Sequence, residues 1–250
     1  MNTHNRPDTF RTIHKAIRKA LFNTAYQAGY TDFTSAGDVA SLLTQFGEMT
    51  HFLQQHAYNE DMYCLPMLDA KSSGMAAHDC EQHEKMERML NELLAQLNEV
   101  VNSPDRLKNQ LGYAFYLSLN RFVALYLTQL DEEETDTAEK VYALCTDEEL
   151  TDMNQQILAN TSPTDVAITY RYLLPAVNNP ERQAVLAEVK ASAPRSVLDR
   201  LLSIAENILT RAHFQQAICY LGIPQKGKKF EYTGLKISRS SIPSAELHVN

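Results

Sequence analysis

Three stretches of the sequence place two potential metal ligands four residues apart. Four residues advance an α-helix by roughly 400°, so both side chains of such a pair lie on one face, about one turn apart. A single histidine, His14, adds a fourth candidate because it lies between Phe10, Ile13 and Ile17 and should face inward. Imidazole and carboxylate ligands together suit iron, manganese or zinc. The candidate ligands are His14, the pair His56 and Glu60, the pair His83 and Glu87, and the pair Gln129 and Glu133.

Each candidate also has an ordinary structural explanation. His56 and Glu60 could form a buried hydrogen-bonded pair, and His14 or His83 could be a core histidine that bonds a backbone carbonyl or a carboxylate. Glu133 lies within an acidic run and could belong to a solvated face. Gln129 could act as a hydrogen-bonding neighbour of a ligand. Metal binding is favoured because charged groups are rarely buried unless they are paired or bind a metal, and here several helices present them together.

The elements that must position these residues are four long helices. Apolar residues spaced three and four apart predict helices over residues 7–28, 38–68, 75–101 and 104–144. We expect Ser103 to cap the last of them with Pro104 at its first position, and Pro66 to bend or end the second. Long helices joined by short breaks are typical of an all-α, up-down-up-down four-helix bundle, predicted here for residues 1–145.

Shorter helices follow in residues 146–221, predicted as a helical extension packed on the bundle. Thr146 with Glu149 forms a capping-box pattern at its start. Residues 222–250 carry a basic cluster, scattered Pro, Gly and Ser, and no helical period. We expect an extended or disordered tail, which could pack on a partner subunit and make a homodimer.

The composition excludes several classes of partner. The chain has 23 Lys and Arg against 31 Asp and Glu, a net charge of −8 among 250 residues. This balance argues against nucleic acid or an anionic membrane as a partner. The first residues lack the apolar stretch of a signal peptide, and no apolar run reaches the roughly 18 residues of a membrane span. The four cysteines are expected to be reduced core thiols, so we predict a cytoplasmic protein.

The sequence resembles the hemerythrin-like, or HHE cation-binding, family over roughly residues 8–150. The matching residues are His14, then His56 with Glu60 followed by the run from Leu65 to Leu68, then His83, then Glu133 in D-E-E-E. The segment RYLLPAVNNPERQAVL also resembles the C-terminal extension of some bacterial members. The resemblance implies two non-haem iron ions between the helices, with carboxylates bridging them. It also implies binding or sensing of oxygen or nitric oxide, or the handling of iron.

The sequence departs from the family pattern in two places. Gln129 stands where the family has histidine, and an amide oxygen is a weaker iron ligand than imidazole. The second histidine of the third helix is also missing, since His78 precedes His83 by five residues and lies roughly 140° away around the helix. Glu87, Glu84 or a water could fill the gap. Alternatively, the site could hold one metal, hold zinc or manganese, or be vacant.

Three functions follow from these alternatives. The first is a binding or sensing protein that uses iron to bind oxygen or nitric oxide. The second is a di-iron oxidase or oxygenase, because replacing histidine by Gln or a carboxylate moves the site toward the carboxylate-rich, oxygen-activating pattern. The third is a metal-free helical scaffold. Neither a glycine-rich phosphate loop nor a G-x-S-x-G elbow supports another chemistry.

Overall fold

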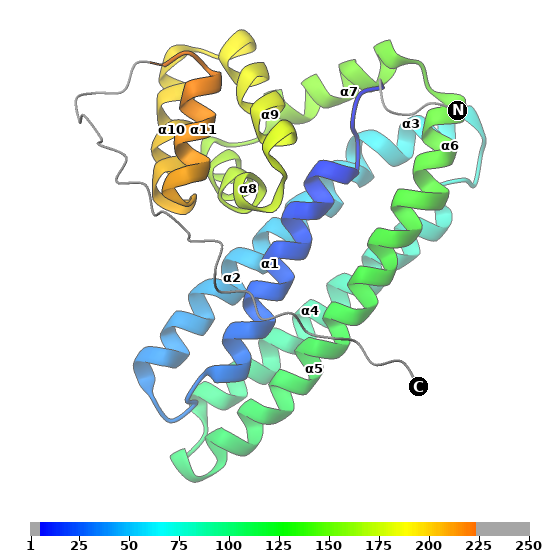
Figure 1. The fold of residues 1–250 in the computed structure, drawn as a ribbon. Helices are drawn as coiled ribbons and strands as arrows, with labels where there is room; N and C mark the ends of the chain where they lie inside the picture. The colour runs from blue at the N-terminus through cyan, green and yellow to red at the C-terminus, as the bar shows by residue number, and fades with distance from the viewer. Residues whose placement is uncertain (1–5, 224–250) are drawn as a thin grey trace, which may run out of the picture.

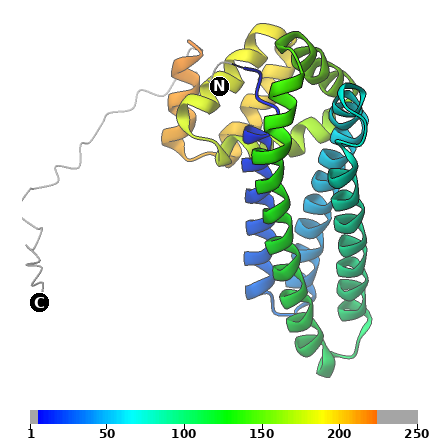
Figure 2. The same cartoon turned by 90° about the vertical axis from the view of Figure 1, so that its right-hand side faces the viewer.

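The computed structural model describes residues 6–223, and every regular element within that range is helical, which confirms the predicted all-α class. Four helical rods dominate the architecture (Figures 1 and 2). They are α1 (Arg11–Tyr30), α2 with α3 (Ala36–Asn59 and Leu65–Lys71), α4 (Ala77–Asn102), and α5 with α6 (Asp105–Glu132 and Ala138–Leu144). Among these rods, α1 contacts α2 and α5, and α4 contacts α5 and α2. The four rods therefore enclose one shared core.

The spacing of buried residues explains why each rod has a single inward stripe. In α4 the buried positions advance by alternating steps of four and three residues, from Asp79 and His83 through Met86 to Val100. That alternation keeps one side of the helix facing its neighbours. Large side chains such as Phe46, Phe115 and Phe122 fill the centre with almost no exposed area. The polar residues of these stripes, including His83, therefore lie in the same core.

The predicted N-cap of the fourth rod was wrong, and of the two effects expected of Pro66, bending or ending the second rod, the structure excludes the ending. Ser103 does not cap the fourth rod, because Pro104 has extended backbone (ψ 146°) and itself precedes the first helical residue, Asp105. Pro66 does not end the second rod, which continues to Lys71. A wide π turn (η2, Glu60–Cys64) precedes the proline and already interrupts the α-helical hydrogen-bond pattern there, so the missing N–H of Pro66 is tolerated.

Five shorter helices follow the rods: α7 (Asp147–Asn160), α8 (Pro163–Ala176), α9 (Asn179–Ser192), α10 (Arg195–Ile208) and α11 (Arg211–Tyr220). The predicted capping box of Thr146 and Glu149 is present at the start of α7. Helix α8 packs against α1 and α2 and adds Tyr172 and Leu173 to the core of the rods. Helices α9, α10 and α11 then build a second apolar core around Leu174 and Leu186. The predicted tail lies almost entirely outside the described residues.

The surface carries few features that point to a membrane or a disulfide. Within residues 6–223, no helix is long and apolar enough to cross a membrane. Cys64 and Cys145 are buried free thiols, as expected, whereas Cys80 and Cys219 are exposed, contrary to the prediction of four core thiols.

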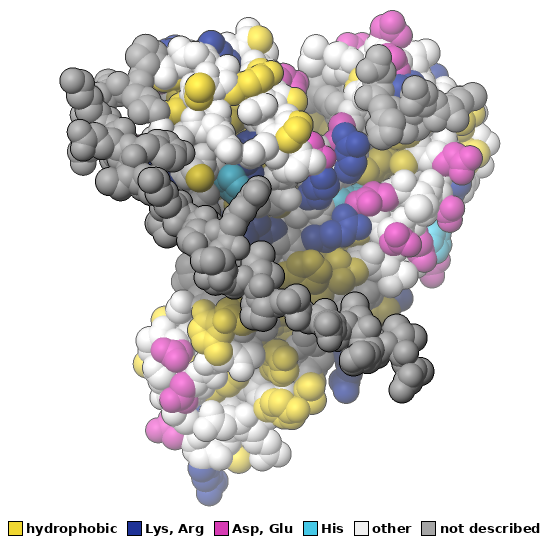
Figure 3. Space-filling model, viewed as in Figure 1, with side chains coloured by type: hydrophobic (Ala, Val, Ile, Leu, Met, Phe, Trp, Pro, Cys, Tyr) yellow, Lys and Arg dark blue, Asp and Glu magenta, His cyan; other side chains and the backbone are white. Residues whose placement is uncertain are grey.

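Figure 3 shows hydrophobic side chains gathered on the lower part of one face. Exposed aromatic residues of α1 include Phe22, Tyr26 and Tyr30.

Two helical glycines predict opposite effects of the same substitution. A Cβ at Gly112 of α5 would lie 2.2 Å from the ring of Phe33, whereas a Cβ at Gly47 of α2 would meet nothing within 4 Å. We expect Gly112→Ala to lower the free energy of unfolding by about 1–3 kcal/mol, because Phe33 must leave its site. Gly47→Ala should raise it by about 0.5–1 kcal/mol through helix propensity. Urea denaturation of both variants measures the difference, and a stabilised Gly112→Ala protein would contradict this packing.

Candidate metal centre

A π turn begins at each of the two inward-facing glutamates. Glu60 opens the turn η2 (Glu60–Cys64), and Glu133 opens η3 (Glu133–Thr137). In both turns the backbone N–H five residues later, of Leu65 or Ala138, donates to the carbonyl of the glutamate. A π turn inserts an extra residue into the helix and commonly occurs at functional sites. The two rods are thus widened at matching points on their inner faces.

The rods bring six of the seven predicted ligands together in the core. His14, His56, Glu60 and Glu133 each offer a ligand atom within 4.8 Å of the others. His83 and Gln129 adjoin this group. All six side chains are buried, and their exposed fractions range from 0 % for His14 to 8 % for His83.

The seventh predicted ligand, Glu87, is exposed and does not join the group. After His83 the buried stripe of α4 continues to Met86 and Leu90 and bypasses Glu87, so the i, i+4 spacing alone was misleading here. Glu84, the other carboxylate considered for this corner, is also exposed. His78 lies outside the core as expected and contacts Glu132 at the surface.

Each of the two glutamates contacts two histidines. Glu60 Oε2 is 3.4 Å from His56 Nε2 and 3.3 Å from His83 Nε2. Glu133 Oε2 is 3.4 Å from His14 Nε2, and its Oε1 is 3.5 Å from His83 Nε2. Gln129 Nε2 donates a hydrogen bond of 2.8 Å to Glu133 Oε1. The rings of His14 and His56 adjoin, with centroids 5.1 Å apart, while His83 contacts both glutamates and Gln129 contacts Glu133.

Two further carboxylates orient the imidazoles from behind. Asp61 Oδ1 lies 2.7 Å from His83 Nδ1, and Glu134 Oε1 lies 3.0 Å from His14 Nδ1. Arg18 in turn donates to Glu134 over 2.5 Å. A carboxylate on Nδ1 holds that nitrogen protonated and points Nε2 toward the centre, the usual arrangement behind a metal-bound histidine.

These two supporting residues were not among the ligands predicted from the sequence. Asp61 and Glu134 each directly follow an inward glutamate, in the pairs Glu60–Asp61 and Glu133–Glu134. A second acidic residue next to a predicted ligand was a usable signal. It could not be interpreted without the partner helix, because each carboxylate reaches a histidine of another rod.

Burial and crowding shift the pKa values of the cluster in opposite directions. Burial, helped by the nearby Glu133, raises the pKa of Glu60 to about 7. Burial and the neighbouring His14 and His83 lower the pKa of His56 well below its usual range. Burial opposes the charged form of His83 too, but its contacts with Asp61, Glu133 and Glu60 raise its pKa to about 12. Without a cation, the carboxylates would therefore depend on a protonated His83.

Unpaired buried atoms test whether a cation fits this cluster. No hydrogen-bond partner reaches six inward atoms, which are the Nε2 atoms of His14, His56 and His83, Oε2 of Glu60 and Glu133, and Oε1 of Gln129. Five of these atoms contact one another only as ion pairs of 3.3–3.4 Å, so a cation shared among them would satisfy them together. Ligand atoms about 2.1 Å from a shared metal lie roughly 3.0–3.5 Å apart, like the 3.3–3.5 Å contacts here. A cation fits.

The family comparison agrees with this geometry. The model of the Hemerythrin HHE cation binding domain matches residues 6–141, which is more than half of the chain. The chain belongs to this family. The matched range contains all six clustered residues and all four rods except the end of α6 beyond Val141. Comparison with curated proteins and with solved structures finds no significant match.

The residues behind the histidines give a direct test of the HHE centre. Asp61→Asn keeps the size of the side chain but removes the charge that orients His83. We expect about 10- to 100-fold weaker metal binding, the usual cost of losing such a supporting carboxylate. Competition titration with a fluorescent Zn²⁺ chelator measures it. Glu87→Gln, one turn from His83 on the exposed side, is the matched control and should bind like the wild type; equal affinity of both variants would refute the supporting role of Asp61.

Proposed function

We propose that this HHE domain binds two non-haem iron ions in its core. The observation that carries the proposal is that Glu60 and Glu133 each lie 3.3–3.5 Å from the Nε2 atoms of two histidines. Glu133 directs one oxygen to His14 and the other to His83. A carboxylate placed this way can bridge two cations, whereas one cation would leave one side of the cluster without a partner. Zinc or manganese could occupy the same ligands.

The proposed ligands divide into two unequal sets. His14 and His56 would bind one ion, and His83 with the Gln129 carbonyl would bind the other, with Glu60 and Glu133 shared. Gln129 Oε1 is buried without a partner while its Nε2 is held by Glu133, so the amide oxygen is free to act as a ligand. The ion next to Gln129 would be held more weakly, because an amide oxygen is a poorer donor than imidazole.

Oxygen or nitric oxide is the proposed small ligand of this centre. Iron would supply the electrons that bind such a molecule, and the protein would provide an apolar, water-poor surrounding. Tyr126 lies buried in the core, where burial and the nearby Glu133 and Glu60 raise the pKa of its phenol well above the usual value. The phenol thus keeps its proton at neutral pH and can donate a hydrogen bond beside the two carboxylates.

Other parts of the proposal concern the whole chain. We infer an up-down-up-down bundle in residues 1–145, an extension in 146–221 that packs on it, and a tail in 222–250 through which two copies could pair. We also propose that the protein is cytoplasmic and of bacterial type.

An enzymatic alternative, a di-iron oxidase or oxygenase, is favoured by one observation: the site has an amide at Gln129 in place of an imidazole. Reversible, spectrally stable oxygen binding supports a carrier or sensor, and turnover or rapid irreversible oxidation supports the enzyme.

Metal content is the deciding measurement. We expect the protein purified without added metal to contain close to two iron ions per chain by inductively coupled plasma mass spectrometry. His56→Ala combined with Glu60→Ala should lose most of this metal, because it removes one terminal and one shared ligand. The isosteric Glu60→Gln variant tests the same point with less disturbance of packing, and Glu87→Ala is the control that should retain full content.

Circular dichroism shows whether each variant is folded. If the folded wild type holds no iron, manganese or zinc above background, the proposal fails and the metal-free scaffold remains. If it holds one ion per chain, the paired site is wrong and a mononuclear centre replaces it.

A further inference from the structure

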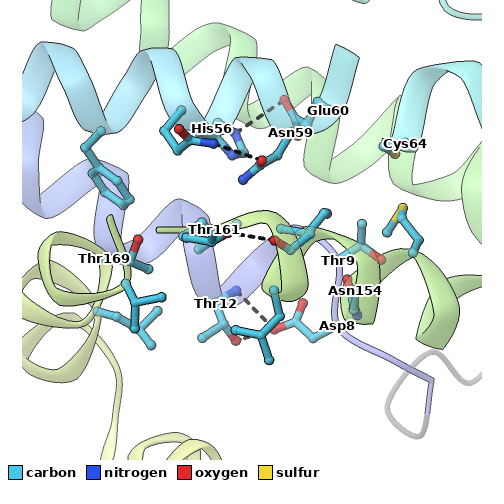
Figure 4. A pocket seen from close by; sticks show the side chains of 18 of the residues that line it. Asp8, Thr9, Thr12, His56, Asn59, Glu60, Cys64, Asn154, Thr161 and Thr169 are labelled. Atoms are coloured by element: carbon cyan, nitrogen blue, oxygen red, sulfur yellow. Dashed lines mark hydrogen bonds and ion pairs between the residues drawn. The ribbon is translucent and has the colours of Figure 1, made fainter. Parts of the chain in front are cut away.

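A hollow of about 280 Å³ lies beside the candidate metal centre, between the rods and the extension. One wall is formed by α2, and the other by the segment before α1 and by α7, α8 and the link between them (Figure 4). Nearly half of the lining residues, from Met153 to Leu173, lie beyond residue 141. The hollow therefore exists only because the extension packs on the HHE domain.

The hollow reaches the proposed metal ligands directly. His56 and Glu60, which belong to the metal cluster, also line it. Thr9 lines it as well, and its Oγ1 is buried without a hydrogen-bond partner. The side-chain amides of Asn59 and Asn154 lie around the same space (Figure 4). The hollow thus offers neutral hydrogen-bonding groups on the wall of His56 and Glu60, from Asn59, and on the facing wall, from Thr9 and Asn154 (Figure 4).

The other lining residues indicate the polarity and charge of a ligand that the hollow can bind. Most of it is apolar, with Phe52, Ile157, Val166 and Leu173 among the contributors. In the part of the chain that the structure describes, neither Lys nor Arg lines the hollow. Its two carboxylates are already engaged, Glu60 in the metal cluster and Asp8 with the backbone N–H groups of Arg11 and Thr12. Apart from the proposed metal ions, an anionic ligand would therefore meet no countercharge in the lining, so a neutral, apolar body is favoured.

The volume of the hollow suits a small organic ligand better than a diatomic gas. A volume of 280 Å³ is several times the roughly 30 Å³ share of one water molecule and near the lower end of the pockets that hold small organic molecules, about 300–1,000 Å³. A second, larger hollow of about 600 Å³ between α8, α9 and α10 shares Leu158, Thr161, Val166 and Tyr170 with the first. The two adjoin, so a longer apolar group can extend from one into the other.

We propose that this hollow binds a small, uncharged, mainly apolar organic molecule, with its hydroxyl or carbonyl group at Thr9, facing His56 and Glu60. The placement next to a metal rests on the proposed function, but the hollow and its lining do not. The molecule would be a substrate or effector of the metal centre, delivered by a path through the extension.

Calorimetric titration of the full-length protein, metal-containing and metal-free, with 1-octanol and with octanoate tests the proposal. Octanol should bind saturably. In the metal-free protein octanoate should bind at least about tenfold more weakly than octanol, because no Lys or Arg of the lining can pair with its carboxylate. Thr169→Phe on α8 and Asn154→Phe on α7 fill the hollow from two different helices and should weaken octanol binding by about tenfold or more. Thr164→Phe is the control, since Thr164 is exposed on α8 and lines neither hollow.

Metal content measured on the same samples separates the two proposals. The Thr169, Asn154 and Thr164 variants should keep the metal of the wild type. Octanol binding by a wild-type protein that contains no metal when purified would support the hollow and refute the metal centre. A metal-containing wild type that does not bind octanol, a metal-free protein that binds octanoate as tightly as octanol, or an octanol affinity that survives both filling substitutions would refute the hollow as the ligand site.

Discussion

The burial of two glutamates against three histidines is the interaction on which this structure depends. Glu60 and Glu133 are almost completely enclosed by the rods, and burial raises the pKa of Glu60 to about 7. Removing such groups from water is costly unless opposite charge and hydrogen bonds replace the solvent. The imidazole of His83 supplies part of that compensation, and a bound cation would supply the rest. The apolar core elsewhere in the rods can form without any of this, so the polar cluster is a feature maintained for binding.

The helices accommodate the cluster by local changes in their geometry. The π turns that begin at Glu60 and Glu133 widen two rods where the carboxylates face each other. The same turns place Asp61 and Glu134 behind histidines of neighbouring rods. In each turn the first acidic residue faces the centre of the cluster, and the second orients an imidazole of a neighbouring rod.

The helices of the extension pack on the HHE domain and enclose a hollow beside its polar cluster. Helix α8 shares the core of the rods through Tyr172 and Leu173, while α9, α10 and α11 have an apolar core of their own. The hollow lies between the two and is lined in part by His56 and Glu60. Residues of α7 and α8 therefore lie across this hollow from two members of the cluster.

The sequence by itself determined the helical class and the inward direction of most candidate ligands, because both follow from spacing along one helix. Apolar stripes identified the rods, and i, i+4 steps indicated that His56 and Glu60, like Gln129 and Glu133, share a face. Tertiary structure decided everything that involves two helices. Glu87 is not part of the cluster because the buried stripe of α4 continues from His83 to Met86 and bypasses it. Asp61 and Glu134 contact His83 and His14 only because the rods pack together. The π turns and the hollow also depend on packing between segments distant in the sequence, and periodicity along a single helix carries no information about such contacts.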